Sequence, residues 1–76
     1  MNIKFFNAKW CGPCKQMKPH IDELISEGYN IQLIDVDEQP ELAQEYNVRG
    51  VPTLVVNGNS LVGYRDKNQI KEAVGA

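Results

Sequence analysis

The sequence predicts a small α/β fold, in which a four-stranded mixed sheet carries helices on both faces in the order βαβαββα. Three observations support this prediction. Short apolar runs alternate with segments whose apolar residues recur every three or four positions, as strands alternate with helices. A strand–helix–strand unit over residues 3–36 implies a right-handed parallel crossover. An Asn-Gly pair between two later apolar runs predicts an antiparallel hairpin.

The first half of the chain holds the parallel unit. Residues 3–6 are a compact apolar and aromatic run that predicts a buried strand, and residues 31–36 predict the second strand. Pro13 suits the first turn of the intervening helix, where a missing N–H costs nothing, and Gly28 supplies its stop. Pro19 is expected to bend this helix. Its apolar residues share one face: Cys14, Met17, Ile21, Leu24 and Ile25.

The second half predicts a short helix followed by a hairpin. Pro40 can open the helix, and three of its residues are expected to face the sheet: Leu42, Ala43 and Tyr46. Residues 53–56 and 61–64 then form antiparallel strands around a turn at residues 57–60.

The last helix begins with a capping box. Asp66 and Gln69 have the spacing in which each side chain bonds the other's backbone N–H. The apolar face of this helix consists of Ile70, Ala73 and Val74. No repeat or linker interrupts the chain, and 76 residues leave room for one domain, so residues 1–76 are expected to form it alone.

Composition excludes several classes of function. The net charge is −2 and no basic run could neutralise several phosphates, so neither nucleic acid nor an anionic membrane is an expected partner. The longest apolar run, at residues 54–56, is far shorter than the roughly 20 residues that span a bilayer. Residues 1–10 lack the pattern of a signal peptide. We therefore expect a cytoplasmic protein.

Cys11 and Cys14 are the two cysteines of the chain, at a predicted strand-to-helix junction. Such a pair can close a small disulfide ring or supply two metal ligands. A structural zinc site needs four ligands and the chain offers one histidine besides, so we expect no metal. A purely structural disulfide between near neighbours would add little stability. A reversible dithiol is the favoured interpretation.

The two thiols are expected to differ. Unpaired N–H groups and the positive end of the helix dipole would stabilise a thiolate at Cys11 and lower its pKa. Cys14 lies one turn deeper, on the face of Met17 and Ile21, where it should be shielded from water and keep a higher pKa. We therefore expect Cys11 to attack a disulfide as the nucleophile and Cys14 to resolve the mixed disulfide.

The sequence Trp10-Cys11-Gly12-Pro13-Cys14-Lys15 is identical to the active-site motif of thioredoxins, and residues 3–75 resemble this family throughout. Pro19 falls where the family kinks the helix, Val51-Pro52-Thr53 resembles its cis-proline segment, and Gly63 falls where a glycine closes the last strand. The resemblance implies a minimal thioredoxin-like fold and a redox-active Cys11–Cys14 disulfide. It also implies a substrate-binding surface of seven residues: Trp10, Gly12, Pro13, Gly50, Val51, Pro52 and Thr53.

The chain also departs from this pattern. Thioredoxins usually carry an extra strand and helix before the first strand, so the length here is that of a glutaredoxin. Phe5 and Leu33 stand where the family has a buried aspartate and its lysine partner, and Asn7 replaces an aromatic residue. Tyr64-Arg65-Asp66 after Gly63 faintly resembles the glutathione-binding segment of glutaredoxins.

The predicted function is that of a thiol–disulfide oxidoreductase, a dithiol electron carrier that reduces protein disulfides and maintains cell redox homeostasis. The resemblance implies no prosthetic group. It implies a thioredoxin reductase-like flavoenzyme as electron donor and disulfide-containing proteins, ribonucleotide reductase among them, as clients of a monomer. One alternative is a glutaredoxin-like enzyme fed by glutathione. The other is a non-catalytic module that binds zinc or a partner.

Other polar residues are interpreted as solvated. His20 follows Cys14 by six positions, about 600° around a helix, so its side chain is expected at the surface and away from the thiols. Lys9 and Lys15 are expected to be solvated lysines. The acidic cluster of Asp35, Asp37 and Glu38 is interpreted as a solvated strand end.

Overall fold

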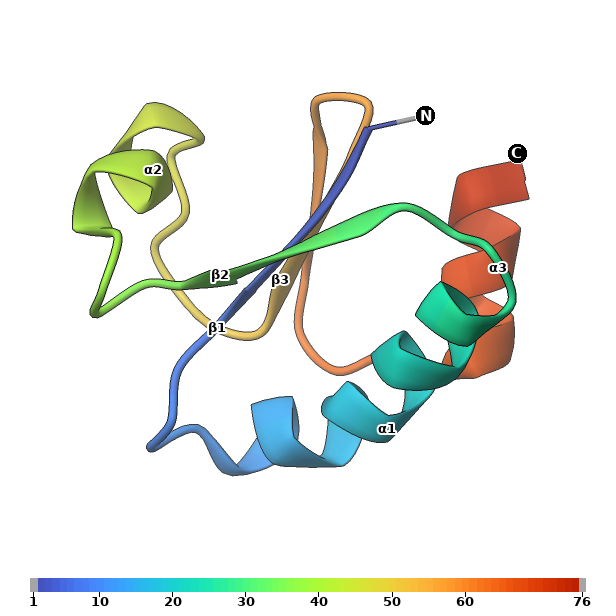
Figure 1. Cartoon of the computed structure of the whole chain (residues 1–76). Coiled ribbons are helices and arrows are strands. Elements are labelled where there is room, and N and C mark those ends of the chain that lie inside the picture. The colour runs from blue at the N-terminus through green and yellow to red at the C-terminus, as the bar shows by residue number, and fades with distance from the viewer. Residues whose placement is uncertain (1, 76) are drawn as a thin grey trace.

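The computed structural model describes residues 2–75 as a four-stranded sheet of order β2-β1-β3-β4 with three helices (Figure 1). The strands are β1 (Ile3–Asn7), β2 (Ile31–Asp35), β3 (Thr53–Val56) and β4 (Asn59–Val62), and the helices are α1 (Gly12–Ser26), α2 (Pro40–Glu45) and α3 (Lys67–Gly75). β1 pairs parallel with β2 and antiparallel with β3, and β3 pairs antiparallel with β4. The predicted α/β fold, element order and strand directions are confirmed.

The predicted fourth strand, residues 61–64, is wrong by two residues at both ends, because β4 covers Asn59–Val62. β4 begins at Asn59, which pairs with Val56, so the hairpin loop is the two residues Asn57 and Gly58. Both have positive φ, 50° and 87°. Two such residues give the turn whose twist matches the strands it joins, and the turn therefore closes without further loop residues.

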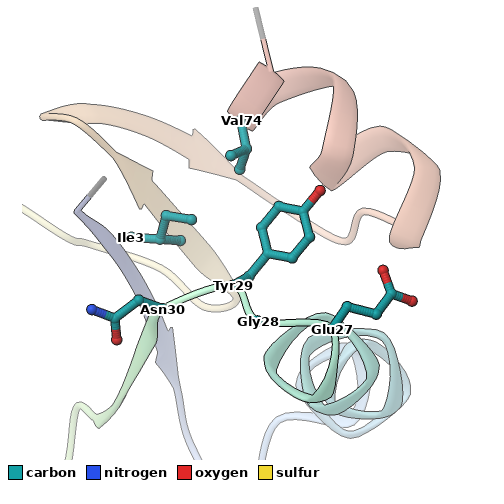
Figure 2. Close-up of a pocket in the computed structure, with 6 residues that line it drawn as sticks. All are labelled: Ile3, Glu27, Gly28, Tyr29, Asn30 and Val74. Atoms are coloured by element: carbon teal, nitrogen blue, oxygen red, sulfur yellow. The ribbon is translucent and has the colours of Figure 1, made fainter.

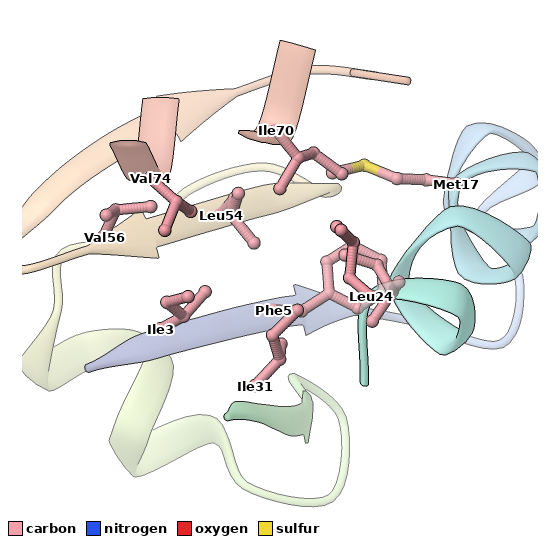
Figure 3. Close-up of a cluster of buried hydrophobic side chains, with 10 residues drawn as sticks. Ile3, Phe5, Met17, Leu24, Ile31, Leu54, Val56, Ile70 and Val74 are labelled. Atoms are coloured by element: carbon pink, nitrogen blue, oxygen red, sulfur yellow. The ribbon is translucent and has the colours of Figure 1, made fainter. Parts of the chain in front are cut away.

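The core has two layers, one on each face of the sheet, because successive side chains of a strand point to opposite faces. Phe5 and Leu54 lie on the face covered by α1 and α3, and Figure 3 shows side chains from both inner strands and both helices meeting there. Phe6 and Val55 lie on the other face. The predicted sheet-facing residues of α2 pack against them: Leu42, Ala43 and Tyr46. Helices on both faces are thus confirmed.

Helix α1 runs past Pro19 and ends as predicted. Gly28 has a φ of 103°, and the N–H of Tyr29 donates to the carbonyl oxygen of Leu24 at 3.0 Å, which closes the last turn. The helix buries Cys14, Met17, Ile21 and Leu24. Ile25, expected on the same face, is exposed because it lies one position past the buried stripe.

Helix α3 begins with the predicted capping box. The N–H of Gln69 donates to Asp66 Oδ1 at 2.9 Å, and the N–H of Asp66 donates to Gln69 Oε1 at 3.0 Å. Ile70 and Val74 are buried. Within residues 2–75, no helix combines the length and apolar character needed to cross a membrane.

An ion cluster joins α1 to α3. Lys67 Nζ lies 3.1 Å from Glu23 and contacts Glu27 more closely, and Lys71 Nζ lies 3.4 Å from Glu27. The hydrogen bond from Lys67, with a second from Lys71, holds the pKa of Glu27 below its ordinary value of 4.5 despite partial desolvation. The same contact with Glu27, followed by Glu23, raises the pKa of Lys67.

Acid is therefore expected to remove a stabilising contribution at Glu27. A carboxylate with a lowered pKa stabilises the folded state fully above its unfolded pKa, and this contribution disappears as the pH falls through the folded pKa. Between pH 7 and pH 3, the free energy of unfolding in urea should fall more for the wild-type protein than for Glu27→Gln. The control Glu72→Gln should behave as wild type. An equal loss in wild type and Glu27→Gln would contradict the expectation.

Candidate functional site

Cys11 and Cys14 lie at the junction between β1 and α1. Cys11 is the N-cap of α1, with extended backbone at φ −86° and ψ 111°, and its carbonyl accepts from the N–H of Lys15 at 3.2 Å. The two cysteines are disulfide-bonded, with their Cα atoms 5.2 Å apart. The strand places the pair at the sheet's end, and the first turn of the helix brings the sulfurs together.

The helix start acts on one sulfur more than on the other. The N–H of Cys14 donates to Cys11 Sγ at 3.2 Å, so an otherwise unpaired N-terminal donor points at that sulfur. A thiolate at Cys11 would keep this donor and the favourable end of the helix dipole. Burial does not separate the two residues, because Cys11 is 4% and Cys14 3% exposed. The expected difference in shielding is therefore not seen, and the unequal roles of the thiols stay a prediction that rests on the hydrogen bond and the helix position.

The cis-proline segment lies beside the sulfurs. The Val51–Pro52 peptide bond is cis, as the resemblance implies. Val51 packs against the buried cluster of Ala8, Cys11 and Cys14. The structure therefore brings together two parts of the predicted site that are about 40 positions apart in the sequence.

Two hydrogen bonds fix this segment. The N–H of Gly63 donates to the carbonyl of Pro52 at 2.9 Å, and Thr53 Oγ1 donates to the carbonyl of Gly50 at 2.7 Å. Pro52 and Thr53 are buried, Val51 is half-buried and Gly50 is exposed. Since the Thr53 hydroxyl is turned back to Gly50, Thr53 shapes the segment from beneath. Contact of these residues with substrate stays a prediction.

Trp10 is the large exposed side chain at the site. It is 67% exposed, and its indole Nε1–H donates to Asp37 Oδ2 at 2.7 Å. Lys9, which precedes Trp10, has its Nζ 3.4 Å from Glu38, which follows Asp37. Gly12 and Pro13, also predicted to bind substrate, begin α1 and are exposed. The interpretation of Asp37 as merely solvated missed its role as the indole's partner.

One signal could have found Asp37. β1 and β2 are parallel, so the residues that follow them meet at one edge of the sheet, and the N–H of Val36 donates to the carbonyl of Asn7 at 2.9 Å. An acidic residue directly after β2 is therefore a neighbour of the residues that follow β1.

Asp37→Ala should free the indole of Trp10. A single exposed hydrogen bond contributes about 1 kcal/mol, so we expect the KM for a disulfide-containing client to rise by about fivefold with kcat little changed. Trp10 is the one tryptophan of the chain, so its fluorescence reports the same change. Glu38→Ala removes a neighbouring charge but keeps the indole bond and is the control. An Asp37→Ala variant with wild-type KM and fluorescence would contradict the role.

A cavity of about 400 Å³ reaches Cys14 from the side of β1. It is lined by Phe5, Asn7, Ala8, Lys9, Cys14, Lys15 and Lys18. Phe5 is fully buried, and its register partner on β2, Leu33, is 43% exposed. Of the two positions at which the family has its charged pair, only that of Phe5 is therefore a core position.

His20 bonds with the other end of the fold. Its partners are Tyr64 and Lys67, so the prediction of a purely solvated histidine is incomplete.

A second cavity, of about 340 Å³, lies where β1 begins and α1 ends, and Figure 2 shows Tyr29 and Val74 facing into it. The cysteines follow the other end of β1. In the part of the chain from residue 2 to residue 75, no three His, Cys, Asp or Glu side chains gather as metal ligands.

Comparison with known proteins agrees with this geometry. The thioredoxin family model matches residues 2–76. Thioredoxin-2 of Pyricularia oryzae is 42% identical over 97% of this chain, and the thioredoxin of Staphylococcus saprophyticus is 37% identical over 97%. The chain spans 40% of the first relative's length and 79% of the second's.

The solved structures agree as well. A mutant thioredoxin from Halobacterium salinarum NRC-1 superimposes with a TM-score of 0.85 at 39% identity, covering 96% of this chain and 70% of its own. These relatives do not favour the glutaredoxin alternative. The dithiol at the start of α1 and the adjoining cis-proline segment fit a thiol–disulfide oxidoreductase site. On the fold, the CxxC pair and these matches together, the chain belongs to the thioredoxin family.

Proposed function

We propose that this chain reduces disulfide bonds in client proteins, with Cys11 as the nucleophile and Cys14 as the resolving thiol. The carrying observation is the hydrogen bond from the Cys14 N–H to Cys11 Sγ at the start of α1. This donor and the helix dipole favour the thiolate at Cys11, and the thiolate is the attacking species in disulfide exchange.

The proposed reaction has two exchanges. The Cys11 thiolate attacks one sulfur of the client disulfide, that S–S bond breaks, and the other client sulfur leaves as a thiolate. Cys14 then gives up its proton and attacks Cys11 Sγ, the mixed disulfide breaks, and the second client thiolate leaves. The client gains two electrons, and the chain ends with a Cys11–Cys14 disulfide.

The Cys14 proton needs an acceptor, and Phe5 offers none. The cavity lined by Cys14, Lys9 and Lys15 supports solvent water as that acceptor, because it connects Cys14 with the surface. The lysines around it would stabilise the thiolate that forms at Cys14. The proposal therefore assigns to water the step for which the family pattern has a carboxylate.

The client chain is proposed to bind beside Cys11. The backbone groups of Val51 would pair with an extended client segment, as an added strand does, and the exposed ring of Trp10 would cover it. Substrate contacts are proposed for the remaining predicted residues as well: Gly12, Pro13, Gly50, Pro52 and Thr53.

The partners follow from this chemistry. Thioredoxins act on disulfide-containing protein targets. For this chain we propose a thioredoxin reductase-like flavoenzyme as electron donor, with ribonucleotide reductase among the clients, and action as a monomer in the cytoplasm.

Recycling of the oxidised protein tests the proposal. In one reaction, NADPH and a thioredoxin reductase are supplied with a disulfide-containing protein, and in the other, glutathione with NADPH and glutathione reductase. We expect turnover in the first. Turnover confined to the second reaction would overturn the proposed electron donor. If neither reaction turned over and the prereduced protein also failed to reduce the disulfide-containing protein, the proposed activity would be overturned. Cys11→Ser is the control for uncatalysed exchange.

A further inference from the structure

His20 makes two hydrogen bonds that tie α1 to the segment between β4 and α3. His20 Nε2 lies 3.0 Å from the hydroxyl oxygen of Tyr64, and the backbone N–H of Lys67 donates to His20 Nδ1 at 3.2 Å. The two rings meet edge to face, with centroids 6.1 Å apart and an interplanar angle of 73°. One imidazole therefore contacts both ends of residues 64–67.

These contacts determine the protonation state of the ring. A backbone N–H can only donate, so His20 Nδ1 must present its lone pair to Lys67. The other ring nitrogen then carries the proton and donates it to the Tyr64 hydroxyl. An imidazolium has a proton on both nitrogens and cannot accept from Lys67. The observed arrangement exists only with neutral His20.

The tied segment continues to the cis-proline. Gly63 directly precedes Tyr64, and the Gly63 N–H donates to the carbonyl of Pro52. Arg65 Nη1 donates to the carbonyls of Val62 and Gly63 at 3.0 and 3.3 Å and closes the loop on its other side. His20 lies on the same helix as Cys14. A chain of direct contacts thus runs from the redox helix to the segment proposed to hold the client.

We propose that neutral His20 is a positioning residue that fixes residues 63–67, and through Gly63 the Pro52 segment, so that client binding weakens when the ring is protonated. The expected change in client binding rests on the proposed function. The hydrogen bonds that carry the inference do not, because they belong to the folded chain.

The charges around the ring favour release when His20 is protonated. The ring contacts the backbone N–H of Lys67 at the amino end of α3, which is the positive end of that helix's dipole, and Arg65 lies in the same segment. Glu23 of α1 would attract an imidazolium, but its carboxylate pairs with Lys67 at 3.1 Å. Asp66 is engaged by the N–H of Gln69. Tyr64 offers an oxygen that an imidazolium keeps as acceptor, so the bond lost is the one to Lys67.

Three variants separate this role from a general effect on folding. His20→Gln supplies an amide oxygen for Lys67 and an amide N–H for Tyr64, and it does not titrate in this range. His20→Leu removes both bonds, and Tyr64→Phe removes only the bond at the hydroxyl. Prereduced protein is mixed with increasing concentrations of a disulfide-containing protein in single turnovers, for each variant from pH 5 to pH 8. The half-saturating client concentration, written KM below, and the limiting rate constant are measured.

We expect the wild-type KM to rise by roughly fivefold between pH 7.5 and pH 5.5 relative to His20→Gln, since the one hydrogen bond lost is that to Lys67. His20→Leu should have the raised KM at every pH. Identical pH profiles for wild type and His20→Gln, or a wild-type KM in His20→Leu, would overturn the role of His20.

A second readout needs no client. Hydrogen exchange of the Lys67 amide should be slow at pH 7.5 in wild type and His20→Gln, and fast in His20→Leu. An amide equally protected in all three would overturn the bond and the inference with it. A protein that reduced no client but showed these amide differences would disprove the proposed function alone.

Discussion

Replacing Cys14 with serine should leave Cys11 joined to the client protein as a stable mixed disulfide, whereas Cys11→Ser should trap no client. In the first variant the attacking thiolate and its helix donor remain, and the thiol that breaks the mixed disulfide is gone. In the second the remaining thiol lacks the N-cap position. Both variants should lose multiple-turnover reduction by a factor on the order of 10³ or more, because removing a covalent nucleophile or its partner removes the pathway.

Non-reducing electrophoresis and intact mass measure the trapped species directly. The reduced variants are mixed with a disulfide-containing protein, quenched with acid and separated, and the adduct mass should equal that of both partners. Adduct from Cys14→Ser and none from Cys11→Ser is the expected outcome. Equal trapping by the two variants would show that the helix start does not distinguish the thiols, and adduct from Cys11→Ser alone would show that the assigned roles are reversed.

Phe5→Ala should destabilise the fold by about 3–5 kcal/mol. The ring is fully buried on the central strand β1, at the meeting point of the sheet with α1 and α3, so its loss leaves a cavity that several elements would have to close. A small domain is stable by only about 5–15 kcal/mol, and the variant should therefore sit near its unfolding threshold. Urea denaturation at pH 7 gives the difference in unfolding free energy.

Two further substitutions at this position separate volume from polarity. Phe5→Leu keeps the site apolar and should cost under about 1.5 kcal/mol. Phe5→Asp places a carboxylate at a fully buried position, and it should destabilise the fold at least as much as alanine does at pH 7. This destabilisation should become smaller as the pH falls, because the protonated carboxyl carries no charge to bury. A Phe5→Ala variant within 1 kcal/mol of wild type would mean that α1 repacks freely over β1, contrary to the packing described above.

Local sequence patterns predicted most of the fold because the relevant physics is local. The capping box of Asp66 and Gln69, the stop at Gly28 and the face of Ile70 and Val74 each depend on spacing within one element. The predicted start of β4 is wrong for a related reason. The polar side chain of Asn59 predicts a turn residue, yet its backbone pairs with Val56, and strand pairing requires no apolar side chain at an edge.

The candidate site was predicted in part. The CxxC spacing and its helix start place both sulfurs, and the position of Val51 beside them followed from resemblance rather than from any local pattern. Asp37 and His20 were missed because their partners, Trp10 and Tyr64, are 27 and 44 positions away. The Trp10–Asp37 pair follows from the parallel pairing of β1 with β2, which the sequence predicts. The His20–Tyr64 pair depends on how α1 packs near α3, and this packing has no signature along the chain.

The strand order β2-β1-β3-β4 places the groups of the site partly on inner strands and partly on edge strands. The sulfurs follow β1 and the cis-proline precedes β3, so both are attached to strands hydrogen-bonded on two sides. Their orienting groups, Asp37 and Gly63, follow β2 and β4, the marginal strands. Strands at a margin open with a smaller free energy than strands in the middle. Brief opening of β2 or β4 would therefore break the contact of Trp10 with Asp37 or of Pro52 with Gly63 while the dithiol stays in place. The groups proposed to hold a client would then move without exposure of the core.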